Sequence, residues 1–164
     1  MRTTAVYAGT FDPITLGHLD LIERSADIFE HVVLAVAEAT PKNTLFSTEE
    51  RLAMAREVTE QFENVEVDTF NDLLVKYARS KDAGILIRGL RAYSDFEYEF
   101  QMALTNRKLE PAIETLFMMP KEIHSYVSSS TVREVAQLGG DTSDFVPPSV
   151  QQHLAAKVGK KIKE

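Results

Sequence analysis

Cysteine is missing from this chain of 164 residues. Its absence excludes disulfide bonds, zinc sites built from thiolates and a thiol nucleophile, and it fits a reducing compartment. No apolar run approaches the roughly 18 residues that a membrane-spanning helix requires. The apolar run that follows Arg2 is also too short for the core of a secretory signal peptide. These absences predict a soluble, cytoplasmic protein with no membrane partner.

Positive charge is scarce as well. The chain has 18 Lys and Arg against 25 Asp and Glu, which gives a net charge of −7. Such a surface repels nucleic acid and anionic membranes, so we expect no nucleic-acid partner. Four lysines do gather near the end of the chain, but lysines in a last helical turn complement the helix dipole and need no other role. They are Lys157, Lys160, Lys161 and Lys163.

Several common catalytic motifs are absent too. The sequence has no P-loop, no Gly-x-Gly-x-x-Gly fingerprint and no Gly-x-Ser-x-Gly elbow. The histidines stand at positions 18, 31, 124 and 153, without the spacing of metal ligands. We expect His31 and His153 at the surface or at helix caps. P-loop, dinucleotide-dehydrogenase and serine-hydrolase chemistry are therefore disfavoured.

What the chain does have is an alternation of strand-like and helix-like segments. Strands are predicted at residues 3–8, 32–37, 65–70, 85–87 and 114–119. Helices are predicted at 47–62, 72–81, 94–109 and 130–138, with another early helix along Leu19 and Ile22 and a last one from Pro147. Ser47 and Ser94 each open a capping box. This order predicts a single α/β domain over residues 1–164, a doubly wound five-stranded parallel sheet with helices on both faces.

In such a fold, ligands bind beyond the carboxyl ends of the strands. The loop at residues 9–18 joins the first strand to the first helix. Gly9 and Gly17 let the backbone approach a ligand, Pro13 stiffens the turn, and Thr15 and His18 lie beside the free amides of a helix N-terminus. A polyphosphate would fit there, although an ordinary strand-to-helix connection could use the same residues.

Other loops at this edge also carry groups suited to phosphate. Arg88 and Arg91 flank Gly89 and Leu90 directly after a strand, where their guanidiniums could grip a phosphate in bidentate fashion. The alternative is that they extend from the strand end into solvent. Lys42 follows the second strand, and by itself it would be an ordinary solvated lysine.

A run of hydroxyls precedes the helix predicted at 130–138. Ser128, Ser129, Ser130 and Thr131 offer side chains and free amides to an anion, and one of them is expected to cap the helix. His124 and Tyr126 lead into this run. They fit either stacking on a base or plain packing.

Three segments together resemble the bacterial phosphopantetheine adenylyltransferases of the nucleotidylyltransferase superfamily, nearly end to end. The first and third are typical of the whole superfamily, and the second points to this member. They are Gly9-Thr10-Phe11-Asp12-Pro13 with Thr15, Gly17 and His18; Arg88-Gly89-Leu90-Arg91 with Asp95-Phe96-Glu97-Tyr98-Glu99; and Val127-Ser128-Ser129-Ser130 with Arg133.

The resemblance implies transfer of adenylyl from ATP to 4′-phosphopantetheine, giving dephospho-coenzyme A and pyrophosphate, with magnesium accompanying ATP. It implies that His18 stabilises the transition state and that Lys42 and Arg91 assist. It places the acceptor on Thr10, Lys42, Leu74 and Arg88. It places ATP on Thr10, Phe11, His18, Gly89, Leu90, Arg91, Glu99, His124, Ser125, Tyr126, Val127, Ser128, Ser129 and Ser130. It also implies a homohexamer inhibited by coenzyme A.

Two positions depart from the family pattern. Ala8 stands where the family usually has proline, and His124 stands where many members have tryptophan.

Two other functions stay open. One is a sibling enzyme, such as a cytidylyltransferase or a nicotinamide-mononucleotide adenylyltransferase, which would need a different acceptor pocket. The other is a nucleotide-binding regulator without activity.

Overall fold

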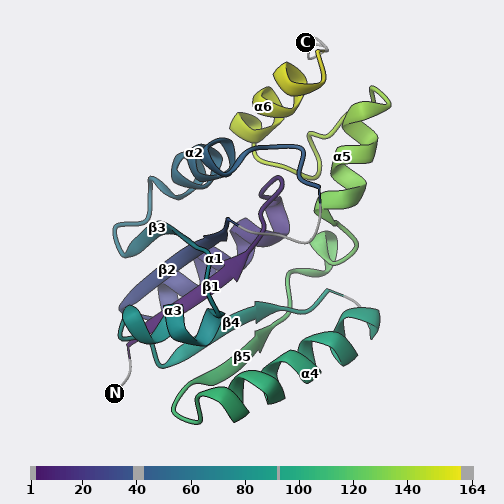
Figure 1. The fold of residues 1–164 in the computed structure, drawn as a ribbon. Coiled ribbons are helices and arrows are strands. Elements are labelled where there is room, and N and C mark those ends of the chain that lie inside the picture. Colours follow the sequence, from purple (N-terminus) through teal and green to yellow (C-terminus); the bar gives the residue numbers. More distant parts are fainter. Residues whose placement is uncertain (1–2, 39–42, 92, 160–164) are drawn as a thin grey trace.

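Five parallel strands form one sheet in the order β3-β2-β1-β4-β5 (Figure 1). The computed structural model describes residues 3–38, 43–91 and 93–159. The strands are β1 (Thr4–Gly9), β2 (His31–Ala37), β3 (Val65–Phe70), β4 (Ile85–Gly89) and β5 (Glu114–Met118). The chain winds outward from β1 to β3 and then returns to β4, on the other side of β1. The order therefore reverses between β1 and β4, where a ligand crevice is expected.

The helices alternate with the strands, as the sequence predicts. They are α1 (Leu16–Ile28), α2 (Thr48–Thr59), α3 (Leu74–Ser80), α4 (Tyr93–Leu109), α5 (Ser129–Gln137) and α6 (Pro148–Val158), with a short 3₁₀ helix η1 (Glu122–His124). Ser47 forms the predicted capping box with Glu50. The capping box predicted at Ser94 is wrong, because α4 already begins at Tyr93 and Ser94 lies within the helix.

Apolar clusters lie on both faces of the sheet, and this confirms the doubly wound fold. One cluster joins Tyr7 and Leu34 to residues of α1, α2, α5 and α6. The other joins Val6 and Val33 to Val75 and Ala78 of α3. β2 is buried along its centre, because both faces of this strand are covered. The result is a rigid platform whose carboxyl edge carries the loops.

The predicted surface histidines are confirmed. His31 Nε2 lies 3.1 Å from an oxygen of Glu66, and His153 Nε2 lies 3.0 Å from an oxygen of Glu57. Both contacts lie at the surface. Among the helices of the described ranges, none combines the length and apolar character that a membrane crossing needs.

Candidate active site

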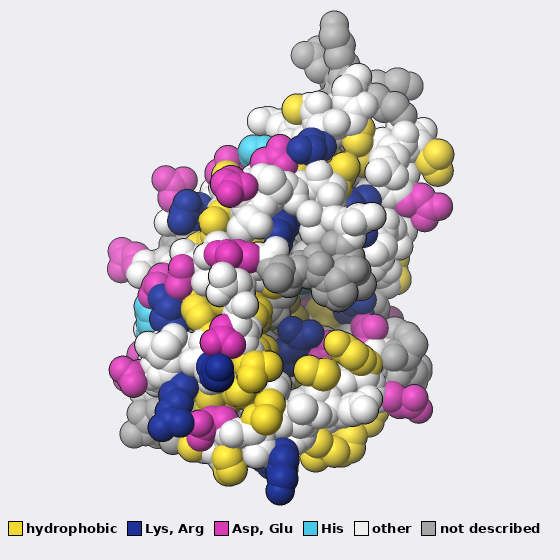
Figure 2. All heavy atoms as spheres, in the orientation of Figure 1, with side chains coloured by type: hydrophobic (Ala, Val, Ile, Leu, Met, Phe, Trp, Pro, Cys, Tyr) yellow, Lys and Arg dark blue, Asp and Glu magenta, His cyan; other side chains and the backbone are white. Residues whose placement is uncertain are grey.

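A pocket of about 260 Å³ opens where the strand order reverses, at the carboxyl ends of β1 and β4. Five segments build its wall: the end of β1 with the loop after it, the start of α1, Asn43 and Thr44, the end of β4 with the start of α4, and the stretch from Pro120 to Arg133. Figure 2 shows a hollow near the middle of this face with basic side chains around it. Arg88, Arg91 and Arg133 line this hollow together with the carboxylates Asp12, Asp95 and Glu99.

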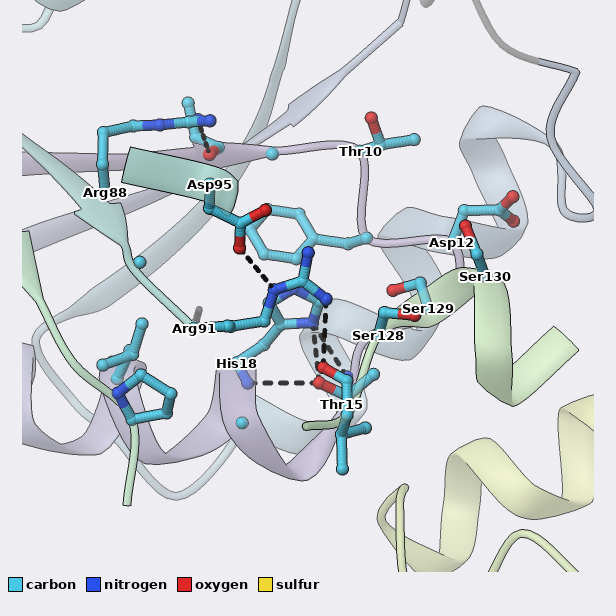
Figure 3. A pocket seen from close by; sticks show the side chains of 18 of the residues that line it. Thr10, Asp12, Thr15, His18, Arg88, Arg91, Asp95, Ser128, Ser129 and Ser130 are labelled. Atoms are coloured by element: carbon cyan, nitrogen blue, oxygen red, sulfur yellow. Dashed lines mark hydrogen bonds and ion pairs between the residues drawn. The ribbon is translucent and has the colours of Figure 1, made fainter. Parts of the chain in front are cut away.

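His18 lies in the first turn of α1 and points into this pocket (Figure 3). Its Nδ1 accepts a hydrogen bond of 3.0 Å from the backbone N–H of Thr15, and the Thr15 hydroxyl in turn accepts from the backbone N–H of His18. This reciprocal capping box holds the ring against the helix end. Because Nδ1 accepts, the hydrogen of the neutral ring sits on Nε2.

The electrostatics around His18 keep the ring neutral. Burial, followed by the positive charges of Arg91 and Arg88, lowers its pKa to about 3. The ring also packs edge-on against Phe11, with centroids 5.0 Å apart. Phe11 holds a left-handed backbone conformation with φ of 51° and is itself wedged against Tyr7. His18 is therefore a fixed, neutral hydrogen-bond donor at physiological pH.

Arg91 extends over the pocket beside His18 (Figure 3). Its Nε lies 3.3 Å from an oxygen of Asp95 in the first turn of α4, and its Nη1 donates to the carbonyl of Val127 at 3.1 Å. The side chain is 40% exposed. Two neighbours thus aim the guanidinium, while most of its N–H groups meet no acceptor among the described residues and can bind an anion.

Arg88 is held more tightly. Its Nε and Nη2 donate to the two carboxylate oxygens of Glu99 at 2.8 and 2.6 Å, and its Nη1 donates to the carbonyl of Ala8 at 2.8 Å. Glu99 occupies the bidentate edge that the sequence suggested for phosphate. One N–H remains on each terminal nitrogen of Arg88. Glu99 lines the pocket but places both oxygens on Arg88, so it positions this arginine.

Asp12 connects three segments of the chain around the pocket. Its two carboxylate oxygens accept from the backbone N–H groups of Leu45 and Phe46 at 2.8 and 2.9 Å. The same carboxylate lies 3.4 Å from Arg133, whose Nη1 also donates to the Asp12 carbonyl. Asp12 is only 3% exposed. It thus joins the loop after β1, the segment before α2 and the helix α5.

The serine run forms the N-terminus of α5, as predicted. Ser128 is the cap and accepts from the backbone N–H of Thr131, while Ser129 donates to the carbonyl of Pro13 at 2.8 Å. Ser130 accepts from Arg133 at 3.3 Å. All three serines line the pocket. The backbone N–H groups of the first turn have no carbonyl partner within their own helix, so this end also favours an anion.

The structure brings most of the predicted site residues into one pocket. Those that line it are Thr10, Phe11, His18, Arg88, Gly89, Arg91, Glu99, Val127, Ser128, Ser129 and Ser130. Those described but outside its lining are Leu74, Leu90, His124, Ser125 and Tyr126. Lys42 lies outside the described residues. His124 nonetheless packs close to the start of α1, since a Cβ on Gly17 would lie 3.6 Å from the Cβ of His124.

Several lining residues escaped the sequence analysis of individual side chains. They are Tyr7, Leu21, Asn43, Thr44, Pro120 and, in their site roles, Asp12, Asp95 and Arg133. Burial raises the pKa of Tyr7 above its ordinary value, so its phenol stays protonated beneath the arginines. The sequence places Tyr7 in a buried strand that ends at the predicted ligand loop, but it does not show that this side chain reaches the pocket.

Comparisons with known proteins agree with this geometry. The cytidylyltransferase-like family model matches residues 6–135. The phosphopantetheine adenylyltransferase of Opitutus terrae is 54% identical over 156 residues, which are 95% of this chain and 98% of that protein. The phosphopantetheine adenylyltransferase of Methylococcus capsulatus is 55% identical over 157 residues, 96% of this chain and 97% of that protein.

A solved structure is similar in fold. It is that of a Vibrio parahaemolyticus protein assigned as a nicotinate-nucleotide adenylyltransferase, and it superposes with a TM-score of 0.69. The match covers 99% of this chain and 98% of the other, at 17% sequence identity. At that identity the likeness concerns the fold alone, and it agrees with the doubly wound sheet described above.

Proposed function

The chain belongs to the cytidylyltransferase-like family and, within it, to the phosphopantetheine adenylyltransferases, and from that membership we propose that its pocket transfers the adenylyl group of ATP to 4′-phosphopantetheine. The products are dephospho-coenzyme A and pyrophosphate. One observation carries the assignment of the pocket: a neutral histidine donor, two arginines and two helix N-termini converge on a single cavity.

The reaction needs no nucleophile from the protein. An oxygen of the acceptor phosphate forms a bond to the α-phosphorus of ATP while the bond from that phosphorus to the pyrophosphate oxygen breaks. Both reactants are polyanions, so catalysis rests on holding them in line and on stabilising charge on the phosphate oxygens. The arginines and the amides of α1 and α5 supply positive potential for both purposes.

His18 stabilises the transition state in this proposal. Its Nε2–H donates to an oxygen of the α-phosphate, where negative charge grows as the new bond forms. A neutral donor is suited to this position, because Arg88 and Arg91 already supply positive charge and lower the pKa of the ring. The Thr15 capping box fixes the ring before substrate arrives, so little reorganisation is needed during the reaction.

The proposal divides the site residues between the two substrates as the family resemblance implies. Arg91 and the N-terminus of α5 face the triphosphate of ATP, with Phe11, Gly89, Leu90 and His124 to Val127 along the nucleotide. Thr10 lies between the substrates. Arg88, with Lys42 and Leu74, takes the phosphopantetheine, and Glu99 contributes by orienting Arg88.

Magnesium is proposed to enter with ATP. The pocket carboxylates Asp12, Asp95 and Glu99 are each engaged by an arginine. No group of three or more metal-ligating side chains occurs within the described ranges. With its carboxylates engaged in this way, the pocket fits a magnesium ion that is held by phosphate oxygens of ATP. There the ion would neutralise part of the triphosphate charge.

We also propose that the enzyme works in the cytoplasm as a homohexamer and that coenzyme A inhibits it. Self-association is supported by an apolar surface on α4, shown in yellow at the lower edge of Figure 2. Phe96, Phe100 and Leu104 are each 46% to 48% exposed there, at a spacing that places them on one side of the helix. Coenzyme A contains the product dephospho-coenzyme A, so it could compete for the same pocket.

The first experiment follows both products. Pure protein is incubated with magnesium-ATP and 4′-phosphopantetheine, and pyrophosphate and dephospho-coenzyme A are quantified together. Stoichiometric formation of both, lost in His18→Ala, supports the proposal. A panel of nucleotides and acceptors tests the sibling activities, and binding of ATP without release of pyrophosphate would indicate a regulator. Light scattering on a sizing column measures the assembly, and titration with coenzyme A measures inhibition.

A further inference from the structure

Arg51 is a charged side chain in a place where charge is costly. It lies in the first turns of α2, only 2% exposed, and it is among the largest fully buried side chains of the described chain. Arginine is almost never buried to this degree without a paired anion. Yet within residues 3–38, 43–91 and 93–159 it makes no ion pair with any carboxylate, although Asp12 and Glu49 lie near enough to favour its charge.

Backbone oxygens take the place of a carboxylate. Nη1 of Arg51 donates to the carbonyls of Thr10 and Ala37 at 2.8 and 2.7 Å, and Nε donates to the carbonyl of Phe46 at 3.3 Å. Nη2 donates to the Thr48 hydroxyl at 3.0 Å. One guanidinium thus joins the loop after β1, the end of β2 and the start of α2.

The bond to Thr10 belongs to a wider pattern in the loop after β1. The carbonyl of Thr10 is held by Arg51, that of Asp12 by Arg133 and that of Pro13 by Ser129. Each of these carbonyls is satisfied by a donor outside the loop, and two of those donors are cations. Free carbonyl oxygens at the pocket would repel a triphosphate. A carbonyl that bonds to a cation is polarised, and its whole peptide group is polarised with it.

Resting on the function proposed above, we propose that Arg51 is a positioning residue for adenylyl transfer, whose buried guanidinium fixes the Thr10 peptide and adds positive potential beneath the anion site. It touches no substrate itself and acts through Thr10. Among the described residues no carboxylate forms an ion pair with it, so part of its field reaches the pocket although Asp12 and Glu49 lie nearby. The family resemblance assigned no role to this position, and a buried arginine is not visible in a helix-forming sequence.

Substitution of Arg51 by methionine tests the proposal, because methionine keeps much of the volume and removes the charge and all donors. The dissociation constant of ATP, measured by calorimetry without acceptor, should rise about 10- to 100-fold, as for loss of a hydrogen bond to a charged group. Its dependence on salt concentration should become weaker. Arg51→Lys keeps the charge but has fewer donors, so it should recover part of the affinity and most of the salt dependence.

Two variants on the same helix serve as controls. Arg56→Met removes an exposed charge, and Val58→Ala lowers stability by shortening a buried side chain. Both should bind ATP within about twofold of the parent protein, because substitutions at sites distant from the pocket have nearly independent effects. Thermal unfolding is measured for all four variants.

The proposal is overturned if Arg51→Met binds ATP like the parent protein, or if Val58→Ala with an equal loss of stability weakens ATP binding equally. Where Arg51→Met does not fold, Arg51→Lys decides: unchanged affinity for ATP overturns the positioning role. Turnover of the parent protein is measured separately. If it binds ATP but makes no dephospho-coenzyme A, the proposed reaction fails while the ATP-binding comparison still tests Arg51.

Discussion

The backbone N–H of Thr15 donates to Nδ1 of His18 at 3.0 Å, so the neutral ring must carry its hydrogen on Nε2, toward the pocket. We predict that ¹⁵N shifts of His18 report a neutral ring protonated at Nε2 from pH 8 down to about pH 4.5. The physical reason is the lowering of its pKa to about 3 by burial and by Arg91 and Arg88. Long-range ¹H–¹⁵N spectra, assigned with His18→Gln, provide the measurement.

A titration midpoint between pH 6 and 7 would contradict this prediction. The same shift has a consequence for stability. Above pH 6.5 the ring is neutral in both the folded and the unfolded chain. Between pH 6.5 and about 3 the unfolded chain binds a proton that the folded protein does not, so His18 lowers the free energy of unfolding as the pH falls through this window.

Removing the His18 ring tests its part in the reaction. We predict that His18→Ala lowers kcat by about 10²- to 10³-fold, as for loss of a donor to a developing oxyanion. The dissociation constant of ATP should change little, because the donor acts mainly in the transition state. Stopped assays of pyrophosphate release and calorimetry with ATP give the two numbers. An unchanged kcat would remove His18 from the mechanism.

The pair formed by Arg88 and Glu99 predicts a combined effect on stability and acceptor binding. Glu99→Gln replaces one acceptor oxygen by an amide that faces an arginine N–H. Because the Arg88 side chain is 29% exposed, we expect a cost of about 2 kcal/mol, below that of breaking a fully buried pair. Melting should fall by roughly 4–8 °C, and the KM for 4′-phosphopantetheine should rise more than that for ATP.

Glu97 on the same helix is exposed and supplies the matched control. Glu97→Gln should leave both the melting temperature and the KM values unchanged. If Glu99→Gln raises only the KM for ATP, Arg88 would instead serve the nucleotide, and the assignment of the acceptor to this arginine would fail.

The outline of the fold could be predicted because it rests on local periodicity. The alternation of strand and helix patterns predicted all five strands and the six α-helices of the described residues, since buried strands read as apolar runs and the helix starts carry capping residues. The boundaries of the elements were predicted less accurately. The helix predicted at 72–81 spans Leu74–Ser80, because Asp72 bonds locally to the N–H of Leu73 instead of continuing the helix.

The site could be predicted only in part, since its partners are distant in sequence. The resemblance to a known family pointed to His18 and Arg91, and the strand order placed them at one edge. The sequence could not show that Arg88 binds Glu99, eleven positions along the chain, or that Asp12 accepts hydrogen bonds from Leu45 and Phe46. Such contacts follow from tertiary packing, which periodicity does not encode.

Loss of the Asp12 carboxylate should change the dynamics of the chain only locally. Asp12→Ala removes both acceptors for the N–H groups of Leu45 and Phe46 and leaves Arg133 without its carboxylate. We expect faster hydrogen exchange at Leu45 and Phe46, because their amides lose buried partners, while amides in the centre of β2 keep their protection. Exchange followed by mass spectrometry with peptide resolution measures both. Equal acceleration across β2 would indicate general destabilisation and not a local connection.

The close approach of Gly89 to Leu21 predicts that substitutions at these two positions compensate each other. A Cβ at position 89 would lie 2.8 Å from Cδ1 of Leu21, closer than real side chains allow, so Gly89→Ala forces the end of Leu21 to move. We expect Gly89→Ala to lower the free energy of unfolding by about 1–3 kcal/mol, the usual cost of overpacking. Leu21→Val removes the clashing carbon, so in the double variant part of that loss should return. Denaturant unfolding of both single variants and the double variant gives the coupling energy, which should favour the double variant by more than about 0.5 kcal/mol. Additive costs would mean that the strain at Gly89 is relieved elsewhere and that Leu21 does not close this side of the strand.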